Sequence, residues 1–173
     1  MKSKRLLVVS NAGPLIHLSK INQLNLLKDM YEEVVIPHEV KVETVNHGRE
    51  RGFPDAIQIE DAINEGWIRV EEIKISAEFT ELAQITGLNI AEVAVIYYAY
   101  KNNGTALLDE DSARTFARTL GIPIRGSLGL VLQGLRRNLL SREEALKALE
   151  QLSEIMYLSA DLYRIMRDEI ERK

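Results

Sequence analysis

Several kinds of chemistry are excluded by residues that the chain lacks. No cysteine occurs among the 173 residues, which excludes disulfide bonds, thiolate metal sites and a cysteine nucleophile. No apolar run approaches the ~20 residues that a membrane-spanning helix needs, so we expect no membrane segment. Gly126-Ser127-Leu128-Gly129 lacks the lysine and the spacing of a phosphate-binding P-loop, and a tight turn into a helix is its simpler interpretation. With only three histidines, no Ser–His–Asp arrangement can be proposed from spacing.

Length and charge limit the class of protein without deciding its function. The chain has the length of about one domain, and its 46% apolar residues suffice for a core without metal or disulfides. The net charge of -4 argues against a broad electrostatic grip on nucleic acid. It does not exclude a nuclease, because an acidic metal cluster adds negative charge that a cation neutralises. The apolar part after Met1–Arg5 is too short for a signal peptide, so we expect a cytoplasmic protein.

Apolar runs alternate with stretches of helical spacing along the chain. Residues 6–9, 34–36, 105–108 and 122–124 are typical of buried strands, and residues 67–75 of an edge strand or an extended arm. Strands that alternate with helices predict a three-layer α/β/α domain with a mostly parallel central sheet.

The last two predicted helices lie outside this alternation. We expect the domain to span residues 1–138, and residues 139–173 to form a helical extension packed on the same domain or on a partner. Ser141 and Glu144 form a capping-box pattern at the start of the first of these helices. Apolar residues on the final helix, residues 159–173, favour a homodimer.

Two polar residues follow the first predicted strand. Ser10 and Asn11 come directly after the apolar run 6–9, and Pro14 suits the first turn of a helix. Open parallel sheets bind ligands beyond the carboxyl ends of their strands, which makes Asn11 a candidate site residue. The alternative, simpler on this stretch alone, is that Asn11 caps the helix. His17, flanked by apolar residues, is interpreted as a hydrogen-bonded interior group.

Two carboxylates leave the predicted strand 105–108. Asp109 and Asp111 together form a hard-oxygen site suited to Mg²⁺ or Mn²⁺. The alternative is again capping, with one of them holding the amides that start the next helix. Both interpretations stay open, and one residue can serve each purpose.

Further acids lie on predicted helices. Glu92 fits a capping box with Asn89, yet it also projects toward an apolar stripe, where a carboxylate needs a cation or another partner. Glu43 is weaker by itself, although Glu39, Glu43 and His47 recur at intervals of four and share one helix face. A zinc site would use such a row, but a solvated face is its commoner meaning.

Taken together, four stretches resemble the PIN-domain family of metal-dependent ribonucleases, which includes the VapC-type toxins of prokaryotic toxin–antitoxin pairs. The likeness is to a little-characterised prokaryotic branch of that family. The stretches fall in the family's order between about Leu6 and Leu135, and no resemblance covers the helices after Asn138. They read VVSNAGPLIHLSK, VVIPHEVKVE, GLNIAEVAVIYYA and ALLDEDSARTFARTLGIPIRGSLG. Each is weak alone, but four in order make a fairly specific signal.

The resemblance implies an α/β/α sandwich whose carboxylates converge at the carboxyl ends of the central strands and bind Mg²⁺ or Mn²⁺. It places Asn11 at the family's first Asp, Glu43 at the second acid, Glu92 at the third, Asp109 or Asp111 at the last, and Ser127 near the metal. The metal ligands are then Asn11, Glu92, Asp109 and Asp111. Asn11 departs from the family pattern. Its amide oxygen can ligate Mg²⁺ but brings no charge, so the site should hold metal more weakly.

The implied activity is metal-assisted hydrolysis of single-stranded RNA by the toxin of a toxin–antitoxin pair, with an antitoxin covering the acidic cleft. Arg49, Arg51, Arg114 and Arg125 are candidate phosphate contacts. Ordinary surface charge is the alternative, and for Arg114 we favour pairing with Glu110. A second hypothesis is a PIN-like fold that no longer cleaves and serves as an RNA-binding or protein-interaction module.

Overall fold

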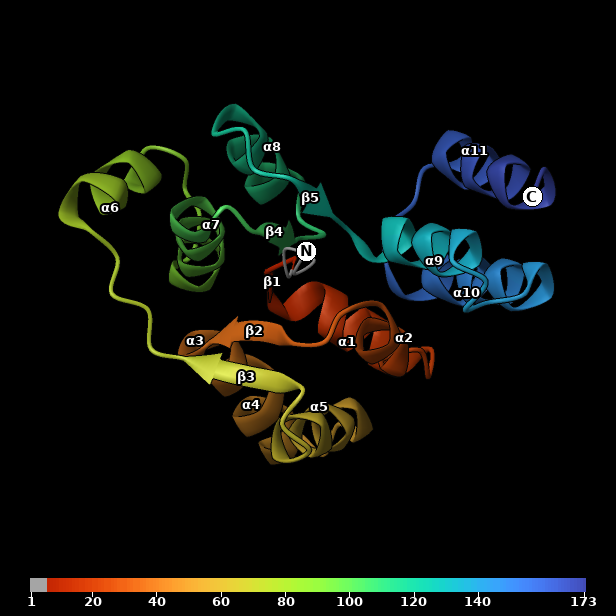
Figure 1. Cartoon of the computed structure of the whole chain (residues 1–173), viewed down its shortest axis with the longest axis horizontal. Coiled ribbons are helices and arrows are strands. Elements are labelled where there is room, and N and C mark those ends of the chain that lie inside the picture. Colours follow the sequence, from red (N-terminus) through yellow and green to blue (C-terminus); the bar gives the residue numbers. More distant parts are fainter. Residues whose placement is uncertain (1–5) are drawn as a thin grey trace, which may run out of the picture.

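The computed structural model describes residues 6–173 (Figure 1), so residues 1–5 of the predicted domain, including the stretch considered as a signal peptide, lie outside the description. The strands are β1 (Val8–Ser10), β2 (Val34–Pro37), β3 (Ile68–Glu71), β4 (Thr105–Leu107) and β5 (Ile124–Arg125). The helices are α1 (Ala12–Lys20), α2 (Asn25–Met30), α3 (His38–Lys41), the π-helix η1 (Val42–Asn46), α4 (His47–Glu50), α5 (Pro54–Asn64), α6 (Ala77–Gln84), α7 (Ile90–Asn102), α8 (Asp111–Thr119), α9 (Ser127–Arg136), α10 (Arg142–Ile155) and α11 (Ala160–Glu171).

The five strands form one all-parallel sheet in the order β3-β2-β1-β4-β5. Val9 in the centre pairs with Val35 on one side and with Ala106 on the other. The chain first builds the sheet outward through β2 and β3, and then returns to the other side of β1 to lay down β4 and β5. Strands β1 and β4 therefore flank the point where the strand order reverses, which is where sheets of this kind bind ligands.

Helices cover both faces of the sheet (Figure 1). On one face α1 packs against both α5 and α9, and on the other α7 packs on β1, β2 and β4, beside α6 and α8. Val9, Leu15, Ile96 and Leu130 are fully buried between these layers. The predicted three-layer α/β/α architecture with a parallel sheet is confirmed. Strand β1 begins two residues later than predicted, because Leu6 is 67% exposed and Ser10 pairs with Leu107.

Helix α7 is the most apolar helix, and local signals in the sequence fix where it begins and ends. Asn89 Oδ1 accepts the Glu92 N–H at 2.9 Å and Glu92 Oε2 accepts the Asn89 N–H at 3.0 Å, so the predicted capping box is present. Asn103 ends the helix in the left-handed conformation, which asparagine tolerates. Residues 91–96 are buried without a break. No helix within residues 6–173, α7 included, is long and apolar enough to cross a membrane.

Helices α10 and α11 fold back onto α9. Helix α10 begins at the predicted capping box, in which Ser141 Oγ accepts the Glu144 N–H at 3.1 Å and Glu144 Oε2 accepts the Ser141 N–H at 2.7 Å. Helix α11 buries Met166 and Ile170. The C-terminal helices thus pack on the domain itself, and Ile165 is left 61% exposed.

Candidate active site

Strands β1 and β4 end side by side, which brings together residues far apart in the sequence. Ser10 pairs with Leu107, and the Asn11 N–H donates to the Leu107 carbonyl at 3.0 Å. Asp109 follows Leu107 by two residues. Asn11 and Asp109 therefore leave adjacent strands at the same edge of the sheet, at the switch point of the topology.

Three protein donors hold the Asp109 carboxylate. Its Oδ1 accepts the Ser127 N–H at 2.7 Å, and its Oδ2 accepts the Ser127 hydroxyl at 2.6 Å and the His17 Nδ1 at 2.7 Å. Burial of this side chain, which is 6% exposed, raises the pKa of the Asp109 carboxyl. The hydrogen bonds from His17 and Ser127 outweigh that effect, so the pKa lies below its usual range. Asp109 is an oriented, buried anion.

Two glycines allow this close packing around Asp109. A Cβ at Gly13 of α1 would lie 3.4 Å from the Asp109 Cβ and Oδ2. A Cβ at Gly126 would lie 2.8 Å from Asp109 Oδ1 and 2.6 Å from Arg114 Nη1. The Arg114 Nη1 donates to the Leu108 carbonyl at 3.1 Å, whereas we had expected Glu110 to be its partner. Glycine is required at position 126 by space, since its backbone lies in the extended region.

Asn11 does not cap the helix that follows it. It stands at the N-cap position of α1, but its side chain accepts no cap hydrogen bond there. The residue is 8% exposed, and Asn11 Oδ1 is buried with no hydrogen-bond partner among residues 6–173. A buried amide oxygen without a partner costs free energy, so an unpaired one in a native fold marks a place for an ordered water or a bound ion. The capping interpretation of Asn11 is wrong.

Glu92 and Glu43 come from different elements and interact electrostatically. Glu92 is 7% exposed at the start of α7, where Oε2 is used by the capping box. Glu43 lies on η1. Partial burial raises the pKa of the Glu43 carboxyl, the negative charge of Glu92 raises it further, and His47 opposes both. Two carboxylates that repel each other form a region that a cation would stabilise.

A π-helix interrupts the helix on which the sequence predicts a row of charged residues. Helices α3, η1 and α4 follow one another without a break, and the Thr44 hydroxyl donates to the Val40 carbonyl at 2.8 Å. The π turn interrupts the regular α-helical spacing of Glu39, Glu43 and His47. Glu43 and His47 still interact, because His47 lowers the pKa of the Glu43 carboxyl. Single π turns are frequent at functional sites, and this one carries Glu43.

Asp111 and Ser127 are the first residues of α8 and α9, the two helices that begin near Asp109. The N-cap of α8 is Glu110, whose side chain makes no cap bond, and Asp111 is exposed in the first turn. Of the two alternatives left open for Asp109, capping of α8 is not what the structure shows, because the Asp109 carboxylate binds the first amide of α9, that of Ser127. Ser127 is fully buried at that helix start.

A cleft of about 1020 Å³ opens beside Asp109. One wall is formed by the loop and helix ends around the sheet edge, and the other by α11 and the segment that connects α10 to α11. The charged residues that line the cleft are His17, Asp109, Glu110, Asp111, Arg114 and Arg125. Of the other predicted phosphate contacts, Arg49 is paired with Glu60 at 2.9 Å on the surface.

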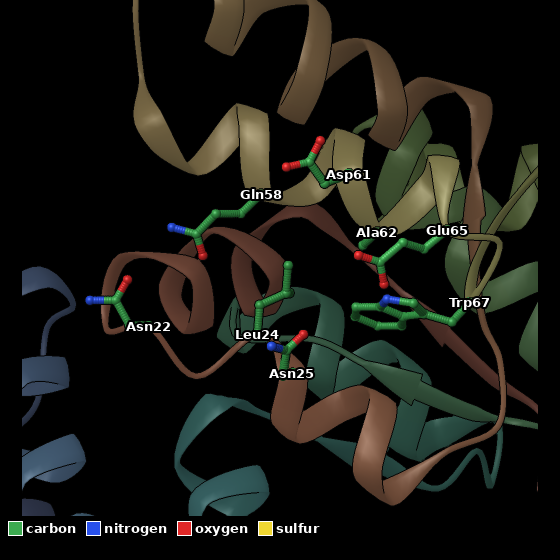
Figure 2. A pocket seen from close by; sticks show the side chains of 8 residues that line it. All are labelled: Asn22, Leu24, Asn25, Gln58, Asp61, Ala62, Glu65 and Trp67. Atoms are coloured by element: carbon green, nitrogen blue, oxygen red, sulfur yellow. The ribbon is translucent and has the colours of Figure 1, made fainter.

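A smaller pocket of about 340 Å³ lies at the opposite, amino edge of the sheet, between the end of α1, helix α5 and the residue before β3. Figure 2 shows the Trp67 indole and the Glu65 carboxylate at one end of it and Asn22 at the other. Lys28 Nζ donates to Glu65 at 3.0 Å. The acids of this pocket, Asp61 among them, belong to a different part of the molecule from Asp109.

The donor chemistry at the switch point fits a hard divalent cation. Asn11 Oδ1 lacks a partner, Asp109 is ionised, and Glu43 and Glu92 repel each other. These oxygens are not gathered into one cage, because no group of three or more His, Asp or Glu side chains within residues 6–173 is arranged to hold an ion. The residues are of the right kind, and the Asp109 carboxylate is occupied by protein donors.

The sequence interpretation missed His17 as a site residue. It was correctly described as a hydrogen-bonded group, but its partner is Asp109, 92 residues away, and its side chain lines the cleft. One signal was available: His17 follows Gly13 by one helical turn, and both face Asp109. Without the position of Asp109, that spacing does not show which residue His17 contacts.

The chain is an α/β protein with a parallel 3-2-1-4-5 sheet and acidic residues at its switch point. Proteins of this class carry their functional site at the carboxyl ends of the strands. Within this class, the profile of the DUF3368 family, described as a PIN domain, matches residues 7–172, and the chain belongs to this family. PIN domains are typically nucleases and usually bind divalent metals. The match continues through the C-terminal helices.

Comparison with solved structures finds the crystal structure of PAE2754 from Pyrobaculum aerophilum. It is 14% identical, with a TM-score of 0.48, and the match covers 67% of this chain and 97% of that chain. A search of curated proteins finds no significant match.

Proposed function

We propose that this chain is a nuclease that hydrolyses phosphodiester bonds of single-stranded RNA with Mg²⁺ or Mn²⁺. The observation that carries the proposal is that an ionised, oriented Asp109 and the unpartnered Asn11 Oδ1 both follow the carboxyl ends of adjacent strands. The adjoining cleft of about 1020 Å³ has room for a nucleotide. Membership of the PIN family supports the same activity.

In this proposal Asn11 and Asp109 are the principal oxygen ligands, and Glu92 and Asp111 supply further negative charge. The chemistry supplied by a bound ion is activation of water and neutralisation of charge on the phosphate. Ser127 and His17 act by orienting the Asp109 carboxylate. The Asp109 Oδ1 accepts one hydrogen bond, from the Ser127 N–H, whereas Oδ2 accepts two, so Oδ1 is the oxygen with acceptor capacity left for an ion.

The second candidate function is an RNA-binding or protein-interaction module without hydrolysis. Two observations favour it: the neutral Asn11 at a position where the family has an acid, and the three hydrogen bonds that the Asp109 carboxylate accepts from the protein itself. Asp109 would then serve the fold by joining α1, β4 and α9.

A digestion of unstructured RNA separates the two candidates. The wild type is compared with the Asp109→Ala/Asp111→Ala double variant at several Mn²⁺ concentrations, with Asp61→Asn as the charge control at the opposite edge of the sheet. Hydrolysis by the wild type and Asp61→Asn that requires Mn²⁺ and is lost in the double variant supports the nuclease. Equal background activity in all three proteins, with RNA binding retained, would support the binding module.

The partners predicted from the sequence belong to the same proposal. An antitoxin would cover the acidic cleft, the protein would act in the cytoplasm, and the exposed Ile165 of α11 would lie in a homodimer contact. Sedimentation of the purified chain, and its co-purification with the product of a small neighbouring reading frame, test these points.

A further inference from the structure

The segment between α10 and α11 returns to the cleft that holds Asp109. Helices α10 and α11 pack on α9, and α9 begins at Ser127, which is bonded to Asp109. The connection between them, residues 156–159, therefore passes the same end of α9. Met156, Tyr157, Leu158 and Ser159 all line the cleft.

Residues 156–159 include one solvent-exposed aromatic side chain, that of Tyr157. Tyr157 is 93% exposed, whereas its neighbours Met156 and Leu158 pack against the core. Ser159 starts α11 by accepting the Leu162 N–H at 3.1 Å. The backbone is thus anchored on both sides of Tyr157, and the exposed ring stands at the border of the cleft.

The cleft is lined by charges of both signs, which favours RNA as its occupant over the core of a protein interface. Arg114 and Arg125 line it, and the Arg114 guanidinium donates to the Leu108 carbonyl. Asp109, Glu110 and Asp111 line it too, and in the proposed function a divalent cation offsets their charge. A groove that combines cations with an exposed aromatic ring matches single-stranded nucleic acid, which offers phosphates and base faces in alternation. The core of a protein–protein interface is instead depleted of charge.

We infer that Tyr157 stacks on a base of the single-stranded RNA while Arg125 contacts its backbone. The inference rests on the proposed nuclease function and adds a substrate-positioning residue from the C-terminal helices. Stacking on an aromatic face depends on the ring and little on the hydroxyl, and it accepts any base. Tyr157→Phe should therefore keep the affinity for RNA, and Tyr157→Ala should lose it.

The test measures binding and hydrolysis separately. Binding of a fluorescein-labelled oligouridylate is followed by anisotropy with Ca²⁺ in place of Mg²⁺ or Mn²⁺, for the wild type, Tyr157→Ala, Tyr157→Phe and the control Tyr100→Ala. Tyr100 is 50% exposed on α7, outside the cleft. We expect the Kd of Tyr157→Ala to rise about 5- to 150-fold, and that of Tyr157→Phe to stay within about twofold. In Mn²⁺ the KM of Tyr157→Ala should rise by a similar factor, and its kcat should change little.

The outcomes distinguish this inference from the function on which it rests. If the wild type hydrolyses RNA but Tyr157→Ala has the same Kd and KM, the stacking is refuted and the nuclease stands. If binding depends on Tyr157 but no Mn²⁺-dependent hydrolysis occurs, the stacking stands and the nuclease fails. A Tyr157→Ala variant that changes only the sedimented mass assigns the ring to a contact between copies and refutes the inference.

Discussion

The His17 ring and the Asp109 carboxylate lie 2.7 Å apart, from Nδ1 to Oδ2, and join the first helix to the end of the fourth strand. An ionised carboxylate can only accept, so Nδ1 donates. A hydrogen bond to a buried charge contributes more than one between neutral groups, and its loss leaves the acceptor partly unsatisfied. This pair contributes to stability and orients the candidate ligand.

His17→Ala should lower the free energy of unfolding by about 1–3 kcal/mol in urea at pH 7, because the Asp109 carboxylate loses one of its donors. His17→Gln, whose amide can also donate, should recover part of the loss. Equal stability of His17→Ala and the wild type would show that the contact carries no net free energy.

Replacement of Asp109 by Asn should have an effect on stability that depends on pH. The folded-state pKa of Asp109 is lowered by His17 and Ser127 against the opposing effect of burial. A lowered pKa contributes stability above the unfolded-state value of about 3.9, and this contribution is lost as the pH falls through the folded-state value. The gap in unfolding free energy between the wild type and Asp109→Asn should therefore be widest at neutral pH and narrow below about pH 4. Asp61→Asn serves as the control, and a gap that is constant with pH would contradict the assignment.

Glu43→Gln should stabilise the metal-free protein at pH 7. Partial burial and the charge of Glu92 raise the pKa of Glu43, so its favourable contribution exists at low pH and is lost as the pH rises through the folded-state value. Removing this charge should raise the Tm in EDTA slightly, whereas Glu50→Gln on the exposed part of α4 should not. Added Mn²⁺ should then raise the Tm of the wild type more than that of Glu43→Gln. A lower Tm for Glu43→Gln in EDTA would contradict the repulsion.

Gly126→Ala and Gly129→Ala form a pair at the start of α9, where Gly126 is the N-cap residue and Gly129 lies in the first turn. The new methyl group at position 126 would meet Arg114 Nη1 and Asp109 Oδ1 below 3 Å, so we expect a loss of about 1–3 kcal/mol and of RNA hydrolysis. At position 129 the methyl group meets no atom of the described chain within 4 Å apart from its own helix backbone, and helix propensity should add about 0.5–1 kcal/mol. Urea unfolding and the digestion assay measure both. Equal behaviour of the two variants would argue against the packing around Asp109.

Asn11→Asp should increase the affinity for Mn²⁺. The substitution adds a negative charge where an unpartnered oxygen is buried, and an extra charge near a bound cation is worth roughly tenfold in affinity. Isothermal calorimetry measures this, with the exposed Asn25→Asp as the charge control. In EDTA the Asn11→Asp variant should be less stable than the wild type, because a buried carboxylate then lacks a cation. Equal or weaker Mn²⁺ binding would count against Asn11 as a ligand.

Local chemistry made much of this fold predictable. Capping boxes need residues three positions apart, and both, at Asn89 and at Ser141, were found from the sequence. Buried parallel strands are apolar throughout, so the alternation of strands and helices predicted the layers and the parallel sheet. The rule that ligands lie beyond strand ends then indicated Asn11 and Asp109.

Tertiary structure alone decided which groups these residues meet. The sequence allowed Asn11 to be a cap and Asp109 to cap α8. Packing left the Asn11 Oδ1 without a partner and placed the Asp109 carboxylate against His17 and Ser127. Likewise, nothing in the spacing of residues 156–159 shows that they pass beside Asp109. Hydrogen bonding within a turn depends on neighbours along the chain and can be predicted from them. The contacts of Asp109 and the position of residues 156–159 depend instead on how the crossover helices and α9 bring distant segments to one edge of the sheet.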